Sequence, residues 1–269
     1  MPARLESAAL DLPSALDWRR KARVARKIAS LAILLALGAP LQWALLRLWP
    51  AGANALPMLF HRAACAVIGL RRDVRGASRG PALLVSNHMS WLDIVALSAC
   101  RPTVFVGKSD IAGWAVFGTL ARLQQTLFVA RERRAGAAAD AAEIARRVAA
   151  GQAVAPFAGG TTSDGCAVLP FGPALLAAAQ GGAFAVQPVA LAYLAREGAP
   201  LDPAGRREIA WWGDKELAPH LVEILALRRL DIRIEFGEAA FPRPGEDRKA
   251  LARRLEADVR ARVASALGA

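Results

Sequence analysis

The sequence predicts an α/β domain with a mostly parallel sheet flanked by helices, preceded by an N-terminal membrane-associated helical hairpin. From Arg71 onward, short apolar runs alternate with helical stretches, which is typical of a parallel sheet covered by helices. A long uncharged apolar stretch near the N-terminus predicts the hairpin. We therefore expect residues 1–70 to form the basic N-terminus and the membrane-associated helices, and residues 71–269 to form the α/β domain.

The composition indicates an anionic partner and contact with an apolar phase. Hydrophobic residues make up 55% of the 269 residues before the 22 glycines are counted, against roughly 45–50% with glycine in ordinary soluble domains. The formal net charge is +12. Anionic membrane lipid fits both properties, whereas nucleic acid is not expected, because the chain has one tyrosine and no interleaving of aromatic and basic residues. The three widely spaced cysteines indicate reduced thiols on the cytosolic side of a membrane.

The first apolar stretch, residues 28–46, contains no charged side chain over 19 positions, close to the ~20 residues that cross a bilayer. A signal peptide is not expected, because the preceding basic region is long and no clear Ala-x-Ala cleavage site follows. The positive-inside rule predicts a cytoplasmic N-terminus from the basic residues before the stretch. These residues are Arg19, Arg20, Lys21, Arg23, Arg26 and Lys27.

A second, partly apolar stretch at residues 51–70 favours a hairpin over a single crossing. Pro40 is expected to bend the first stretch, and Trp43 and Trp49 to anchor it at the membrane interface. Two such stretches fit a re-entrant or interfacial helical hairpin better than one clean span. The alternative is a pair of apolar helices packed on the core of a soluble protein.

The remaining elements follow from hydrophobic runs and from helix start and stop residues. A proline at position 188 predicts an edge strand or a bulge there. The expected strands are residues 82–86, 103–107, 126–130, 153–157, 184–191 and 232–236, and the expected helices are residues 137–150, 173–180 and 247–267.

One of the three histidines lies at a predicted strand end, which is where α/β enzymes keep their chemistry. His88 falls in the loop after strand 82–86, and Asp93 falls in the first turn of the next helix. A carboxylate so placed can fix one imidazole tautomer and leave the other nitrogen as a base toward a hydroxyl group. The alternative is structural: Ser90 to Asp93 also fits a capping box, in which Asp93 only caps the helix.

Four segments in order resemble the glycerolipid acyltransferase family that includes bacterial 1-acylglycerol-3-phosphate acyltransferases. They are Asn87-His88-x4-Asp93, Thr126-Leu-Phe-Val-Ala-Arg131, Phe157-Ala-Gly-Gly-Thr-Thr-Ser-Asp-Gly165 and Val186-Gln-Pro-Val189. The resemblance extends from about Leu56 to the C-terminus, and the family order of the four segments favours the catalytic interpretation of His88.

The resemblance implies an acyltransferase of phospholipid biosynthesis that moves a fatty acyl group from acyl-CoA or acyl carrier protein to the free hydroxyl of 1-acyl-sn-glycerol 3-phosphate. His88 would be the base and Asp93 its orienting carboxylate. Arg131, with Gly160 and Thr161, would bind the phosphate of this lysophospholipid acceptor. No metal or other cofactor is expected, and the expected place is the bacterial inner membrane, with the catalytic domain on the cytoplasmic face.

The third segment departs from the family pattern F-P-E-G-T-R-S, and the departures leave alternatives open. Ala158 replaces the proline, Gly159 replaces the glutamate and Thr162 replaces the arginine. One alternative is acylation of lyso-ornithine lipid or another lysolipid. Another is a catalytically weak relative that binds anionic lipid. A metal hydrolase is not expected, because the sequence offers no further convincing ligand cluster.

Overall fold

A computed structural model of the chain describes residues 17–50, 52–130, 136–180 and 184–268. Within these residues the strands form one eight-stranded sheet in the order β1-β8-β6-β2-β5-β3-β4, with β7 paired to β6. The pairs β1–β8, β6–β2, β2–β5, β5–β3 and β3–β4 are parallel, while β6–β8 and β6–β7 are antiparallel. The predicted α/β fold with a mostly parallel sheet is confirmed.

The predicted strands all occur, with ends that differ by a few residues. The expected helix at residues 173–180 is a 3-10 helix, η3, and six elements were not predicted: β1, β7, η1, α4, α6 and α7. The strands are β1 Leu70–Arg75, β2 Ala82–Ser86, β3 Val104–Lys108, β4 Leu127–Val129, β5 Ala153–Pro156, β6 Val186–Arg196, β7 Ala199–Pro200 and β8 Leu230–Phe236. The helices are α1 Trp18–Leu48, α2 Ala55–Ile68, α3 Leu92–Ser98, η1 Ser109–Gly113, α4 Ala115–Leu123, α5 Ala137–Ala149, η3 Leu175–Ala179, α6 Pro203–Ile209, α7 Leu217–Ala226 and α8 Arg248–Leu267.

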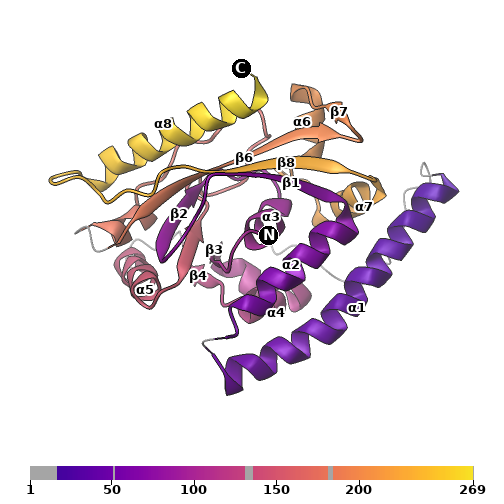
Figure 1. The fold of residues 1–269 in the computed structure, drawn as a ribbon, viewed down its shortest axis with the longest axis horizontal. Helices are drawn as coiled ribbons and strands as arrows, with labels where there is room; N and C mark the ends of the chain where they lie inside the picture. The colour runs from indigo at the N-terminus through magenta and orange to yellow at the C-terminus, as the bar shows by residue number, and fades with distance from the viewer. Residues whose placement is uncertain (1–16, 51, 131–135, 181–183, 269) are drawn as a thin grey trace.

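Helices cover both faces of the sheet, as Figure 1 shows, with α8 across the top and α2, α3 and α7 below. Each face has its own apolar core, because side chains of a strand alternate between the two faces. On β2, Leu84 joins the core beneath α2, α3 and α7, and Leu83 joins the core beneath α5 and α8. A strand buried on both faces reads as one apolar run, which is why the sequence identified β2 so closely.

Pro188 lies in the central strand β6, so the expectation of an edge strand there is wrong. The register of the antiparallel partner does shift by one residue across it, from Val186 opposite Ala240 to Val189 opposite Phe236, as the alternative expectation of a bulge requires. Pro188 pairs with Val85 of β2, and pairing with β8 begins one residue later. Pro188 therefore lies at an irregularity in the antiparallel pairing, where its carbonyl oxygen accepts from the Gly237 amide at 2.9 Å.

The two N-terminal helices form a hairpin whose first helix, α1, is continuous through Pro40. Polar side chains attach α1 to the rest of the molecule near both ends. Lys27 Nζ donates to the carbonyl oxygens of Ile68 and Leu227, at 2.5 and 2.6 Å. Toward the other end, Gln42 Nε2 donates to the carbonyls of Ala53 and Leu123, both at 2.9 Å.

The outer surface of α1 is apolar and exposed. Of the helices in the described part of the chain, α1 alone is long and apolar enough to cross a membrane, and only 6% of its apolar window is buried. It therefore differs from a core helix and indicates membrane association. The large exposed apolar side chains of the hairpin are Trp18, Ile33, Leu37, Leu41, Trp43, Leu48, Trp49 and Leu59.

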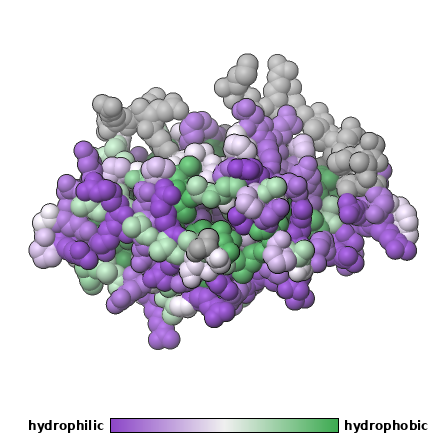
Figure 2. Space-filling view, turned by 90° about the horizontal axis from the view of Figure 1, so that it is seen from above, coloured by the Kyte–Doolittle hydropathy of each residue, from purple (hydrophilic) through white to green (hydrophobic). Residues whose placement is uncertain are grey.

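The face on which α8 lies has a different character. Seen from above in Figure 2, this face is mostly hydrophilic, and hydrophobic residues reach the surface only in a band across its middle. The uncovered apolar surface of the molecule is thus concentrated on the N-terminal hairpin.

Candidate active site

His88 and Asp93 meet where β2 ends and α3 begins. His88 Nδ1 lies 2.8 Å from Asp93 Oδ2. Asp93 is fully buried, whereas 14% of the His88 side chain is exposed. An ionised carboxylate can only accept hydrogen bonds. Nδ1 of His88 therefore carries a hydrogen and donates it to Asp93. Nε2 is then the nitrogen with a free lone pair, and it can accept a proton from a hydroxyl group.

Asp93 also caps the helix, so the two interpretations of the sequence hold together. Its Oδ2 accepts from the backbone amides of Met89 and Ser90, at 2.7 and 3.0 Å. This is one half of a capping box; the other half is missing, because the Asp93 amide donates to the Ser90 carbonyl oxygen at 2.9 Å. The helix cap and the histidine therefore share one carboxylate oxygen.

Tyr193 supplies a further partner of Asp93 that the sequence did not predict. The Tyr193 hydroxyl, on β6, donates to Asp93 Oδ1 at 2.7 Å. Burial of the ring and the neighbouring Asp93 charge raise the pKa of Tyr193 well above its usual value, so the hydroxyl stays protonated and donates. The sequence contained a signal that could have pointed to this residue. Tyr193 is the sole tyrosine of the chain and follows the fourth family segment by four residues.

The loop after β5 encloses the imidazole. The Phe157 ring stacks on His88 with centroids 3.8 Å apart and planes 8° from parallel. The Ser163 amide donates to the His88 carbonyl at 2.9 Å. Gly160 and Thr161 lie between these two contacts and are exposed, and Gly160 has φ +76°, which favours glycine. The structure thus brings the Gly160–Thr161 turn and the His88–Asp93 pair into one site.

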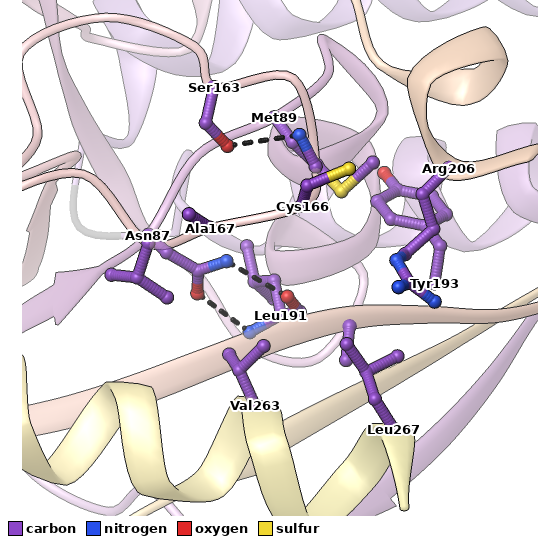
Figure 3. A pocket seen from close by; sticks show the side chains of 13 residues that line it. Asn87, Met89, Ser163, Cys166, Ala167, Leu191, Tyr193, Arg206, Val263 and Leu267 are labelled. Atoms are coloured by element: carbon purple, nitrogen blue, oxygen red, sulfur yellow. Dashed lines mark hydrogen bonds between the residues drawn. The ribbon is translucent and has the colours of Figure 1, made fainter. Parts of the chain in front are cut away.

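A side-chain amide extends the β2–β6 pairing into the His88 loop. Asn87 Nδ2 donates to the Leu191 carbonyl, and the Leu191 amide donates to Asn87 Oδ1, both at 2.9 Å, as Figure 3 shows. The cavity drawn there has a volume of about 20 Å³ and is lined by Asn87, Met89 and Tyr193 among others. That volume suits a water molecule and is too small for a lipid headgroup.

The other two histidines have structural partners. Trp91 Nε1 donates to His220 Nδ1 at 3.1 Å, and His220 Nε2 lies 3.1 Å from the Ile209 carbonyl, so His220 is a neutral link. Burial lowers its pKa to about 4. His61 Nδ1 bonds the Pro57 carbonyl at 2.6 Å, and burial lowers its pKa as well. His88 is the histidine that a carboxylate orients.

Arg131 and Gly159 differ from the other predicted site residues. Arg131 lies outside the described residues. Gly159 leaves little room at the glutamate position of the family, because a Cβ atom there would lie 3.0 Å from Leu169 Cβ. Among the described residues, no group of three or more His, Cys, Asp or Glu side chains could hold a metal ion.

These features define a class of protein: an α/β domain with a carboxylate-oriented histidine at the end of a central parallel strand, beside an apolar helical hairpin. Residues 70–192 match the Acyltransferase family. A lyso-ornithine lipid O-acyltransferase of Brucella abortus is 45% identical over 237 residues, which cover 85% of this chain and 89% of the relative. A 1-acyl-sn-glycerol-3-phosphate acyltransferase of Neisseria gonorrhoeae is 32% identical over 219 residues, covering 80% and 83%.

A solved structure shares the fold. The 1-acyl-sn-glycerophosphate acyltransferase of Thermotoga maritima aligns with a TM-score of 0.66 at 17% identity, over 91% of this chain and 97% of that one. The chain belongs to the acyltransferase family, as the resemblance of its four segments predicted.

We predict that His88→Ala lowers the rate of acyl transfer by roughly 10²- to 10⁴-fold, the usual contribution of a general base. The imidazole is partly exposed, so the fold should persist. His61→Gln, which keeps a donor for the Pro57 carbonyl, is the control and should retain activity. Steady-state kinetics and thermal unfolding of both variants test this, and normal turnover by His88→Ala would exclude a base role.

Tyr193→Phe should act through Asp93. Among the described residues Tyr193 is the one side-chain donor to Asp93 Oδ1, so its removal leaves a more basic carboxylate, which should hold a protonated His88 more strongly. We expect kcat/KM to fall about tenfold at neutral pH and the acidic limb of its pH profile to move to higher pH. A merely structural role would lower the thermal stability without moving that limb.

Proposed function

We propose that the chain transfers a fatty acyl group from a thioester to the free hydroxyl of lyso-ornithine lipid. The observation that supports this proposal most strongly is the similarity to the Brucella abortus relative, which is 45% identical over 89% of that protein's length. Relatives in Rhizobium meliloti and Pseudomonas aeruginosa with the same name are 43% and 33% identical. Lyso-ornithine lipid is the alternative acceptor that the departures of the third segment from the family pattern left open.

The charge of the loop after β5 supports this acceptor. Between Phe157 and Gly165 the sole charged side chain is Asp164, which pairs with Arg207 at 3.0 Å. Thr162 stands where the family has an arginine, so the loop offers no cation. A phosphate monoester carries between one and two negative charges at neutral pH. An ornithine headgroup has one carboxylate and one ammonium group and is neutral overall, which suits a loop whose one charged side chain is already paired.

A second candidate acceptor is 1-acyl-sn-glycerol 3-phosphate. The Neisseria relatives of that name are 32% and 34% identical. Arg131, Gly160 and Thr161 would bind its phosphate, and arginine suits that role through its charge and bidentate geometry.

The proposed reaction uses His88 as base for either acceptor. His88 Nε2 takes the proton of the acceptor hydroxyl while the oxygen attacks the thioester carbonyl carbon. Asp93 stabilises the resulting imidazolium. As the carbon–sulfur bond breaks, the thiolate of CoA or acyl carrier protein leaves and takes the proton back from His88. The protein needs no cofactor in this scheme, because the acyl donor is a co-substrate.

The acceptor assignment is tested with one acyl donor and two acceptors. We expect kcat/KM to be at least tenfold higher for lyso-ornithine lipid than for 1-acylglycerol 3-phosphate. Thr162→Arg should raise the relative use of the phosphate acceptor about tenfold, because it adds a charge-assisted hydrogen bond to phosphate. Thr162→Gln controls for side-chain size. Faster turnover of 1-acylglycerol 3-phosphate by the unaltered protein would favour the second candidate.

We further propose that the N-terminal hairpin lies in the cytoplasmic interface of the inner membrane and does not cross it. Lys27 and Gln42 are 15 residues apart, or about 22 Å along the helix axis. Lys27 donates to the Leu227 carbonyl and Gln42 to the Leu123 carbonyl, and both carbonyls lie outside the hairpin. A helix held at both ends by a domain on one side of a bilayer cannot span that bilayer, whereas its exposed apolar surface suits shallow burial.

Single cysteines at the two ends of α1 test this arrangement. In a background without Cys65, Cys100 and Cys166, Trp18→Cys and Trp49→Cys should both resist a membrane-impermeant maleimide in intact spheroplasts. Both should react after lysis, because both side chains are exposed. Labelling of Trp49→Cys in intact spheroplasts would show that α1 crosses the membrane.

A further inference from the structure

A second pocket lies at the far end of α3 from the active site. Asp93 occupies the first turn of α3, whereas the pocket is lined by Ala99 and Cys100, directly beyond its last turn. Seven helical residues span ~10 Å, so the pocket is separate from the His88 site. Its volume is about 330 Å³, at the lower end of the range for ligand pockets.

Three arginines from three different elements line this pocket: Arg62 of α2, Arg72 of β1 and Arg101 after α3. No carboxylate of the described residues lines the pocket or forms an ion pair with them. Elsewhere on the same sheet arginines are paired: Asp73 bonds both Arg75 and Arg233 at 2.8 Å. Like charges gathered without a counter-ion repel one another, and an anion in the pocket would relieve this.

Neutral groups hold the three guanidinium groups and leave N–H donors over. Arg62 Nε donates to the Ala99 carbonyl at 2.9 Å, and Arg72 Nη1 lies 3.9 Å from Cys100 Sγ. Arg101 donates to Ser78 Oγ and to the Gly80 carbonyl. Its buried Nε atom has no hydrogen-bond partner among the described residues. A guanidinium has five N–H donors, so each of the three retains donors for a ligand.

We infer that this pocket binds the phosphate of an anionic phospholipid headgroup. Arginine pairs with phosphate in a bidentate geometry, and three such side chains can surround one phosphodiester. Apolar side chains at the margin favour a lipid over a free ion. Val74 lines the pocket and is 45% exposed, and Leu59, one turn before Arg62 on α2, is 53% exposed. The net charge of +12 provides attraction toward an anionic bilayer.

The experiment compares two neighbouring arginines of β1. Arg71 and Arg72 point to opposite faces of the strand, and Arg71 does not line the pocket. The full-length protein in neutral detergent is titrated calorimetrically with dihexanoyl phosphatidylglycerol and, separately, with inorganic phosphate. Arg72→Gln should weaken lipid binding about ten- to a hundredfold. Arg71→Gln should bind as the unaltered protein does, and both variants should keep their acyl-transfer rate.

Two outcomes would overturn the inference. Equal lipid affinity in Arg71→Gln and Arg72→Gln would exclude the pocket as the site. Inorganic phosphate bound as tightly as the lipid would exclude the lipid assignment. Should Arg72→Gln fail to fold, Arg62→Gln gives the same comparison, because Arg62 is exposed and its loss removes one donor to a backbone carbonyl.

Discussion

The local structure around the site depends on one buried carboxylate. Asp93 accepts hydrogen bonds from His88, from two backbone amides of the preceding turn and from Tyr193 on β6. A carboxylate without such partners would be costly to bury, so the loop, the start of α3 and the central strand must all be in place before the charge is accommodated. The same contacts fix the imidazole tautomer. Folding of this region and orientation of the histidine are therefore one requirement.

The sequence revealed the parts of this arrangement that are local and missed those that come from a distance. The strand–loop–helix around His88 could be predicted because its apolar run, histidine and carboxylate are adjacent. The contacts of Tyr193 and Asn87 with residues about 100 positions away could not, since no spacing rule connects them. Strand β1 was missed because Leu70–Arg75 is mostly charged. It lies at an edge of the sheet, where polar side chains remain solvated.

The loop after β5 supports His88 at some of its positions and departs from the family pattern at others. Phe157 and Ser163 hold the imidazole and the backbone of His88 at either end of the loop. Between them the Ala158 amide donates to the Ser86 carbonyl at 3.1 Å, whereas no hydrogen bond among the described residues joins Gly159 or Thr162 to the His88–Asp93 pair. The contacts that hold His88 and the departures from the family pattern thus occupy different positions of one loop.

The attachment of α1 near both of its ends has a consequence for how substrate arrives. Lys27 and Gln42 join the hairpin to the ends of α7 and α4, so the hairpin and the α/β domain would move together as a single unit on the membrane. In the proposed interfacial arrangement, a lysolipid would reach His88 by lateral diffusion within one leaflet and would not have to desorb into water. The concentration that governs turnover would then be the mole fraction of lysolipid in that leaflet, and dilution with inert lipid would slow the reaction at constant bulk concentration.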